Sequence, residues 1–371
     1  MGQISDLPSA LSRLKQSVWW TALTLAAFLL ADAAIFRSGW YDRYLEPDSS
    51  AGTAELRLFW LWNSPPPRVP DVMVVGDSRI AEGFSARVAA QAASGKFHFE
   101  NFGLAGSDPR VWYYVLRDAD PQRDRFAAIA ITVAPYSDED GDPDWQSHLT
   151  DVNYSIGRLR LVDCWDFARS FPVPDLERQA LVGCLFPGAT LRRDVRALLA
   201  NVRARLRKAK DWRKNGLGYE EGYEGKAEDV GGLSADWTLR TIHFPPGLNS
   251  EQISTIQDFV MPEPAPQTGA LTEYRKLWLG RILDLYKNSA TSIIFFELPR
   301  APIPIPEARI PPRFIDSVRG RPNVTVLPAT TFRDLERPEV FADGLHLNRL
   351  GRPIFSARLA EQVAAVLGGG R

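Results

Sequence analysis

Cysteine, histidine and net charge are all scarce in this sequence. Its 371 residues include 2 cysteines and 4 histidines, and the cysteines have no other soft ligand near them at metal-binding spacing, which disfavours a zinc site. The formal net charge of −1 argues against a general nucleic-acid binder. A glycine-rich phosphate loop and a dinucleotide fingerprint are both missing. The sequence therefore predicts neither a metal nor a cofactor.

The two cysteines, Cys164 and Cys184, leave two interpretations open. In an exported domain they would form one disulfide, which would contribute roughly 3 kcal/mol to stability. The alternative is that the bond does not form.

A nearly unbroken apolar run covers residues 17–36. As a helix it would extend about 30 Å, the thickness of the hydrocarbon layer of a bilayer. Arg13 and Lys15 precede it, and positive charge on that side predicts an N-terminus inside and a body outside. We therefore expect a cytoplasmic segment, residues 1–16, and a single-pass helix in a bacterial-type inner membrane. The rest of the chain would be periplasmic or otherwise extracytoplasmic.

Two details of this run have alternatives. Ala31-Asp32-Ala33 weakly resembles a cleavage site, so a cleaved signal peptide is the alternative to an anchor, although the run is long for one. Asp32 lies about 6 Å from the outer end of the run. A solvated interfacial carboxylate is expected there, and a partner contact within the membrane is the alternative.

Residues 37–68 follow the apolar run and end in a proline-rich stretch. Such a stretch is stiff and extended, so we expect this segment to form a stalk. Within it, Leu56 to Trp62 would form a short helix packed on the body or on the membrane surface.

The most informative stretch of the chain is residues 71–79. An apolar run from Val72 to Val75 ends in Gly76-Asp77-Ser78, and a helix-tolerant segment follows. A short apolar run closed by such a turn is typical of a buried strand in a parallel sheet. Ser78 would then lie where strand passes into helix, beside helix amides that favour negative charge. The simpler interpretation is a serine that only caps the helix.

Alternating strand and helix patterns extend over much of the chain from residue 69 onward. Apolar runs at 97–99, 126–133, 291–298 and 324–327 predict further strands, with helical segments between them. This alternation predicts an α/β domain, residues 69–371, with a central parallel sheet between two helical layers, as in flavodoxin-like three-layer sandwiches.

A divergent insert, about residues 138–270, interrupts this alternation and is expected to lie beside the site as a lid or platform. Within it, Arg192 to Lys214 predicts one amphipathic basic helix. Its charged face is either solvated or in contact with anionic lipid or an acidic polysaccharide. The glycine-rich residues 215–232 predict a mobile loop.

Asp343 and His346 lie near the C-terminus, just before a predicted final helix. A nucleophilic serine needs a base, and the base needs an orienting carboxylate. Asp343 would face one ring nitrogen of His346 while the other faces Ser78. The alternative is a histidine without a role at the start of a helix.

Gly76-Asp77-Ser78 at the end of the first strand, together with Asp343-x-x-His346, resembles the SGNH (GDSL-type) hydrolases. The resemblance covers roughly residues 69–366. It implies a Ser78, His346 and Asp343 triad and an oxyanion hole made by the backbone N–H groups of Ser78 and Gly106. For Gly106, a plain strand-to-helix turn is the alternative.

The sequence departs from the family where a Gly-x-Asn-Asp block normally follows the third strand. Ala134-Pro135-Tyr136-Ser137 stands there instead. Either the hole keeps two backbone donors, or Tyr136 or Ser137 replaces the asparagine. Losing one such donor costs about 3 kcal/mol of barrier elsewhere.

Four residues near the predicted site are candidates for binding substrate: Asp77, Arg79, Tyr136 and Arg300. Arg300 follows the strand predicted at 291–298, so it would lie at the carboxyl edge, where it could grip an acid or neutralise an oxyanion. The alternative is an ordinary surface arginine.

The departure also resembles the membrane-anchored SGNH proteins that accompany membrane-bound O-acyltransferases in cell-surface polymer acylation. The resemblance implies a serine esterase or O-acyltransferase that acts on acyl, chiefly acetyl, groups of an extracytoplasmic glycan. Its partners would be the acylated glycan or acyl donor and a membrane acyltransferase. The alternative is an inactive scaffold that binds such an acyltransferase or a polysaccharide export complex.

Overall fold

The computed structural model describes residues 7–133, 145–216, 222–261, 273–306 and 317–369. A five-stranded parallel sheet forms its centre, in the order β2-β1-β3-β6-β7. The strands are β1 (Asp71–Gly76), β2 (His98–Gly103), β3 (Ala128–Val133), β6 (Ser292–Glu297) and β7 (Val324–Val326). The predicted α/β class and central parallel sheet are confirmed.

Helices cover both faces of this sheet, as the apolar strands require. Alternate residues of β1 enter two cores, Val72 and Val74 on one side and Met73 and Val75 on the other. The first side is covered by α3 (Ser78–Gly83), α4 (Ala86–Ala92) and α15 (Gly351–Gly368). The second is covered by α2 (Ser50–Asn63), α5 (Pro109–Ala119) and α13 (Tyr274–Tyr286).

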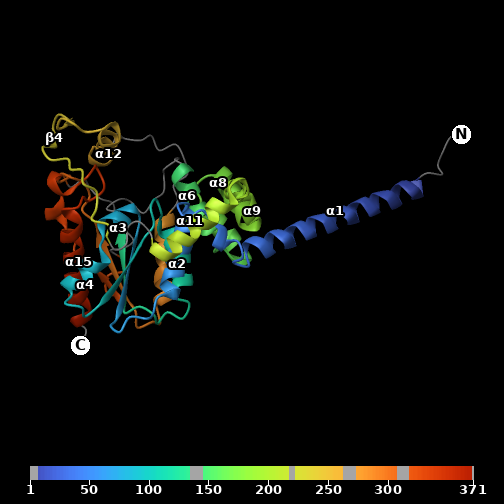
Figure 1. The fold of residues 1–371 in the computed structure, drawn as a ribbon, viewed down its shortest axis with the longest axis horizontal. Coiled ribbons are helices and arrows are strands. Elements are labelled where there is room, and N and C mark those ends of the chain that lie inside the picture. Colours follow the sequence, from blue (N-terminus) through green and yellow to red (C-terminus); the bar gives the residue numbers. More distant parts are fainter. Residues whose placement is uncertain (1–6, 134–144, 217–221, 262–272, 307–316, 370–371) are drawn as a thin grey trace.

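The long helix α1 (Leu7–Phe36) projects away from the sheet (Figure 1). Its part from Lys15 to Phe36 is long and apolar enough to cross a membrane.

The segment expected to be a stalk is packed on the domain over much of its length. After η1 (Asp42–Tyr44), helix α2 buries Leu58 and Leu61 against the second core. The predicted short helix at 56–62 is confirmed as part of α2 and packs on the body, whereas an extended stalk is wrong for this part. The proline-rich stretch that suggested it comes after α2, and the apolar face of α2 is what attaches the segment to the body.

The insert helices between residues 145 and 215 form a bundle beside the outer end of α1, packed on α2, α5 and α13 (Figure 1). They are α6 (Trp145–Ser155), α7 (Cys164–Arg169), α8 (Pro174–Leu185), α9 (Pro187–Thr190), α10 (Arg192–Ala200) and α11 (Val202–Asn215), with η2 (Leu161–Asp163) before α7. A disulfide joins Cys164 to Cys184 with a Cα–Cα distance of 5.4 Å, which confirms the predicted pair.

The predicted single basic helix is wrong, because Asn201 breaks it into α10 and α11. The break turns Arg205 inward. Its guanidinium lies 2.8 Å from both Asp194 and Glu46, and its side chain is buried. Part of the basic face is therefore paired within the fold rather than solvated.

The described end of the glycine-rich segment is also packed against the domain. Val230 is buried in the first core, so the mobile-loop prediction, which covered residues 215–232, does not hold at its C-terminal end. A short hairpin of β4 (Ser234–Asp236) and β5 (Thr241–His243) follows, and then α12 (Ser250–Val260). Before α15 lie η3 (Arg333–Leu335) and η4 (Pro338–Val340).

Gly103 allows α3 to lie directly against β2. A β-carbon on Gly103 would stand 2.1 Å from the backbone nitrogen of Ala81, a distance that no side-chain motion can relieve. We predict that Gly103→Ala lowers the free energy of unfolding by roughly 3 kcal/mol. Urea denaturation measures this.

Gly157→Ala is the matched control, because nothing lies within 4 Å of its added β-carbon. It should change the unfolding free energy by less than about 0.5 kcal/mol. Equal effects of the two substitutions would contradict the close packing of α3 on β2.

Candidate active site

Ser78 begins helix α3 directly after β1, as the sequence predicted. Asn101, a buried residue of the neighbouring strand β2, holds this helix in place. Its side-chain amide donates to the carbonyl of Phe84 at 2.9 Å, and its oxygen accepts from the Gly103 N–H at 2.9 Å. Asn101 thus satisfies backbone groups that the end of this short helix would leave unpaired. The sequence analysis missed this role.

Asp343 and His346 lie on a short loop that is pinned at both ends. Phe341 and Leu347 form an antiparallel bridge, and the Ala342 N–H donates to the His346 carbonyl at 2.9 Å. Beyond the loop, the side chain of Asn348 accepts hydrogen bonds from the first N–H groups near α15. The loop therefore holds its two titratable side chains in one arrangement.

The structure brings Ser78, His346 and Asp343 together. His346 Nε2 lies 2.9 Å from Ser78 Oγ, and His346 Nδ1 lies 2.9 Å from Asp343 Oδ2. Both distances are within hydrogen-bond reach. One ring nitrogen is thus held by a carboxylate while the other faces a hydroxyl, which is the arrangement that lets a histidine take a proton from a serine.

Asp343 is held as an anion by several donors. Its Oδ1 accepts from the backbone N–H groups of Leu345, at 2.8 Å, and His346, at 2.7 Å. Burial raises the pKa of Asp343, but the hydrogen bond and charge of His346 and these two N–H groups outweigh it. The pKa of this carboxyl therefore lies well below its ordinary value.

Lys226 adds a positive charge beside Asp343, and the sequence analysis missed it. Its Nζ lies 3.3 Å from Asp343 Oδ2 and 3.1 Å from Glu82 Oε2 on α3. Burial lowers the pKa of Lys226, but the two carboxylates outweigh it, so the net pKa is raised and the ammonium stays charged. Lys226 therefore links the serine helix to the Asp343 loop.

Asp77 and Arg79, both predicted to bind substrate, pair with each other. The Arg79 guanidinium meets the Asp77 carboxylate at 2.8 Å, and the Arg79 N–H donates to the same carboxylate at 2.9 Å. Burial raises the pKa of Asp77, but Arg79 outweighs it and lowers the net pKa. In the structure this pair shapes the turn that presents Ser78.

Gly106 lies at the same edge of the sheet as Ser78. Gly76 of β1 pairs in register with Gly103 of β2, and Ser78 and Gly106 follow these strand ends. Gly106 has a φ of +67° and is exposed, so its glycine is explained by its backbone conformation. The Ser78 N–H opens a helix and has no acceptor within it. Tyr136 and Ser137 lie outside the described residues.

Arg300 is paired with Glu336. Its Nε lies 2.8 Å from Glu336 Oε1, and its Nη2 lies 3.1 Å from the other carboxylate oxygen. Glu336 is itself buried. The pair ties the end of β6 to the segment before the His346 loop, and the binding of substrate by Arg300 stays a prediction.

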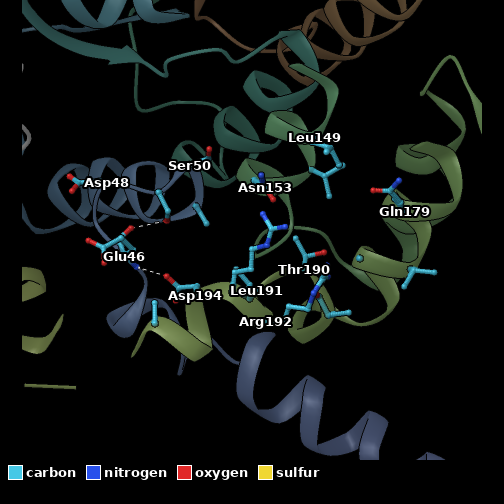
Figure 2. A pocket seen from close by; sticks show the side chains of 18 of the residues that line it. Glu46, Asp48, Ser50, Leu149, Asn153, Gln179, Thr190, Leu191, Arg192 and Asp194 are labelled. Atoms are coloured by element: carbon cyan, nitrogen blue, oxygen red, sulfur yellow. Dashed lines mark hydrogen bonds between the residues drawn. The ribbon is translucent and has the colours of Figure 1, made fainter. Parts of the chain in front are cut away.

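A separate pocket of about 910 Å³ lies between α2 and the insert helices (Figure 2). Its lining includes Leu149, Asn153 and Thr190, and none of the three triad residues. Asp194 on its wall accepts from the Glu46 N–H at 3.0 Å. This pocket is distinct from the triad.

One group of metal-ligand type occurs among the described residues. Asp71, His98 and Glu100 bring one ligand atom each within 4.8 Å of one another. They lie at the amino ends of β1 and β2, whereas Ser78 follows the carboxyl end of β1. His98 Nδ1 is already 2.8 Å from Asp71 Oδ1. This group takes no part in the candidate active site.

The sequence matches no protein-family model and no curated protein sequence. Function must therefore be argued from the geometry of the site.

We predict a pH-dependent stability contribution from Asp343. Because its folded-state pKa is lowered, its ionised form stabilises the fold above the ordinary carboxyl pKa of about 4, and this stabilisation is lost as the pH falls toward the folded-state pKa. The difference in unfolding free energy between wild type and Asp343→Asn should be widest near neutral pH and shrink toward about pH 3. Urea denaturation across this range measures it, and a difference that does not change with pH would contradict the assignment.

Proposed function

We propose that the protein is a serine-dependent esterase or O-acyltransferase. The observation that carries the proposal is the 2.9 Å approach of His346 Nε2 to Ser78 Oγ, with Asp343 holding the other ring nitrogen. The motifs that resemble SGNH hydrolases support the same conclusion, and the parallel sheet with Ser78 at its carboxyl edge is the architecture in which ligands bind at that edge.

In the proposed reaction, Ser78 Oγ attacks an ester carbonyl while His346 Nε2 accepts the hydroxyl proton. The oxyanion that forms is met by the N–H groups of Ser78 and Gly106. His346 then returns the proton to the leaving alcohol, and an acyl-serine remains. A second hydroxyl, from water or from a sugar, gives its proton to His346 and attacks the acyl carbon. The bond from the acyl carbon to Ser78 Oγ then breaks, and His346 returns the proton to Ser78 Oγ.

Asp343 contributes by fixing the ring of His346 and by stabilising the imidazolium that forms in each step. Its lowered pKa keeps the carboxylate ionised for this role. Lys226 and the two backbone donors hold the carboxylate in place, so that the ring does not need to reorient during the reaction.

We place the reaction outside the cytoplasm, on the acyl groups of a glycan. The apolar stretch of α1 is long and apolar enough to cross a membrane. The positive charge of Arg13 and Lys15 before it supports an inner membrane with the N-terminus inside. The Cys164–Cys184 disulfide fits an oxidising compartment. The resemblance to membrane-anchored SGNH proteins supplies the substrate class and a membrane O-acyltransferase as a partner.

We predict that a fluorophosphonate forms one covalent adduct with the folded chain, because only an activated serine attacks such a probe readily. Intact-mass spectrometry measures the adduct. Ser78→Ala should abolish it, and His346→Ala should slow its formation by at least about 100-fold through loss of the base.

Ser254→Ala is the control, since Ser254 is an exposed serine of α12 outside the triad. It should label like the wild type. A folded wild-type chain that forms no adduct at any pH would overturn the enzyme proposal and favour the scaffold alternative.

A further inference from the structure

The insert contacts α1 along the last turns of this helix, at the end that meets the body (Figure 1). The Gly188 N–H at the start of α9 donates to Asp32 Oδ1 at 3.0 Å, and the rings of Phe28 and Phe186 have centroids 6.1 Å apart. A β-carbon on Gly188 would stand 2.6 Å from the ring of Phe36, so the approach is close. Asp32 is thus bound within its own chain, neither solvated nor left for a partner.

These contacts set the position of the corner between α8 and α9 along the axis of α1. Phe28 precedes Phe36 by about 12 Å of helix at 1.5 Å per residue. The helix between Lys15 and Phe28 measures only about 20 Å, less than the roughly 30 Å of a hydrocarbon layer. If α1 spans a bilayer with Lys15 at the inner side, the residues of α1 that contact this corner lie within the outer leaflet.

The surface around this corner is apolar, as such a position requires. We define the insert tip as Leu161, Val162, Trp165, Val182 and Leu185, all of which are exposed. Val162 is 82% and Leu161 63% exposed, fractions that are costly for such side chains in water.

The insert tip is fastened to the outer end of α1. Arg37, the first residue after the helix, donates hydrogen bonds to the carbonyls of Leu159 and Cys184. The Cys164–Cys184 disulfide joins the start of α7 to the end of α8. These bonds therefore hold the tip residues at a fixed position relative to α1.

Charge near the tip suits a lipid headgroup layer. Arg169 stacks on the ring of Trp165, with its guanidinium carbon 4.4 Å from the ring centroid. Tryptophan and arginine are residues that favour the membrane interface, where one end meets acyl chains and the other meets polar groups.

We propose that the insert tip lies in the outer leaflet of the bilayer that α1 crosses. Its apolar side chains are buried among headgroups and upper acyl chains, at the 5–10 Å depth typical of interfacial protein surfaces. This rests on α1 spanning a bilayer and is independent of the chemistry at Ser78. The tip and α1 together form one membrane-binding unit.

The test uses the full chain in phosphatidylcholine vesicles, with and without a lipid that carries a nitroxide high on its acyl chain. The emission of Trp165 is obtained as the difference between wild type and Trp165→Phe. The matched comparison is Trp62, from Trp62→Phe, because the two indoles have nearly equal exposure, 52% and 51%. Trp62 lies at the far end of α2, where Leu61 accepts a hydrogen bond from Arg125 near the amino edge of the sheet.

We expect the nitroxide lipid to quench the Trp165 component at least about threefold more than the Trp62 component. As a second readout on the unchanged chain, a photoactivatable lipid should form adducts within residues 160–165 and 182–187. Equal quenching of the two tryptophans, or adducts confined to α1, would overturn the proposal. A tip that binds a second protein instead of lipid would also give equal quenching of the two tryptophans, because these vesicles contain no other protein.

Discussion

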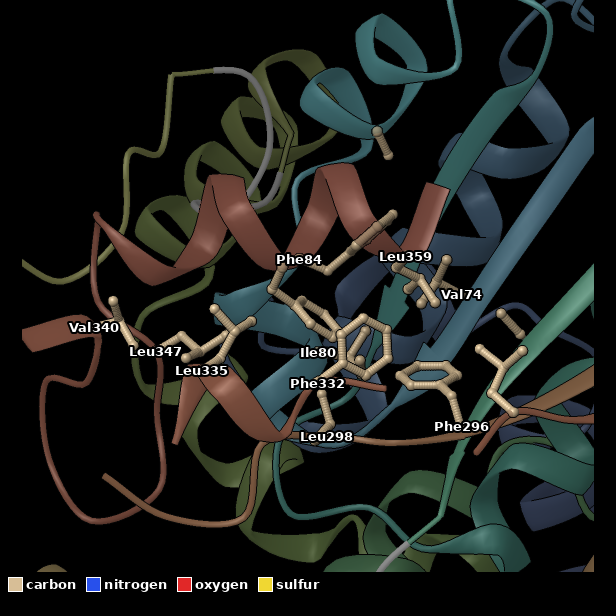
Figure 3. Packing of buried hydrophobic residues seen from close by; sticks show 14 of the residues in the cluster. Val74, Ile80, Phe84, Phe296, Leu298, Phe332, Leu335, Val340, Leu347 and Leu359 are labelled. Atoms are coloured by element: carbon tan, nitrogen blue, oxygen red, sulfur yellow. The ribbon is translucent and has the colours of Figure 1, made fainter. Parts of the chain in front are cut away.

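The candidate active site depends on one apolar cluster that joins distant parts of the chain. Leu347, directly after His346, packs against α3, the helix that Ser78 begins. Leu347 and Ile80 of α3 belong to the same apolar cluster, which is shown in Figure 3. Ile80 and Phe84 enter it from α3, and Val340 enters it from the segment before the Asp343 loop. Because interiors are close-packed, this cluster fixes the separation of two side chains that stand 268 residues apart.

Polar contacts also hold α3 and the Asp343 loop in position. Asn101 holds the far end of α3, the Asp77–Arg79 pair holds its start, and Lys226 bridges Glu82 to Asp343. Asn101 and Lys226 each join α3 to another element, so a shift of α3 relative to the loop would break these contacts. The geometry at Ser78 is therefore held by packing and by charge at the same time.

The parts of this arrangement that follow local rules could be predicted from the sequence. An apolar run closed by Gly76-Asp77-Ser78 placed the serine at a strand end, and the Asp343 and His346 spacing placed the other two groups on one loop. Lys226 could not be found this way, because its partner Asp343 lies 117 residues along the chain and its glycine-rich surroundings carry no periodicity. The break of the basic helix at Asn201 could not be predicted either. The pairing of Arg205 with Glu46, which is distant in the sequence, outweighs the continuous helical pattern of residues 192–214.

The contact between α1 and the insert also pairs groups from distant parts of the chain. An unpaired Asp32 would be costly inside a bilayer. The Gly188 N–H of the insert donates a hydrogen bond to it and reduces this cost.

Rapid-quench mass spectrometry with p-nitrophenyl acetate would show whether Ser78 carries an acyl group during turnover. We expect one acetyl group on the peptide that contains Ser78, formed together with the released nitrophenol and absent from Ser78→Ala. Release of nitrophenol with the acetyl group on another residue, or no release by the folded chain, would contradict the proposal.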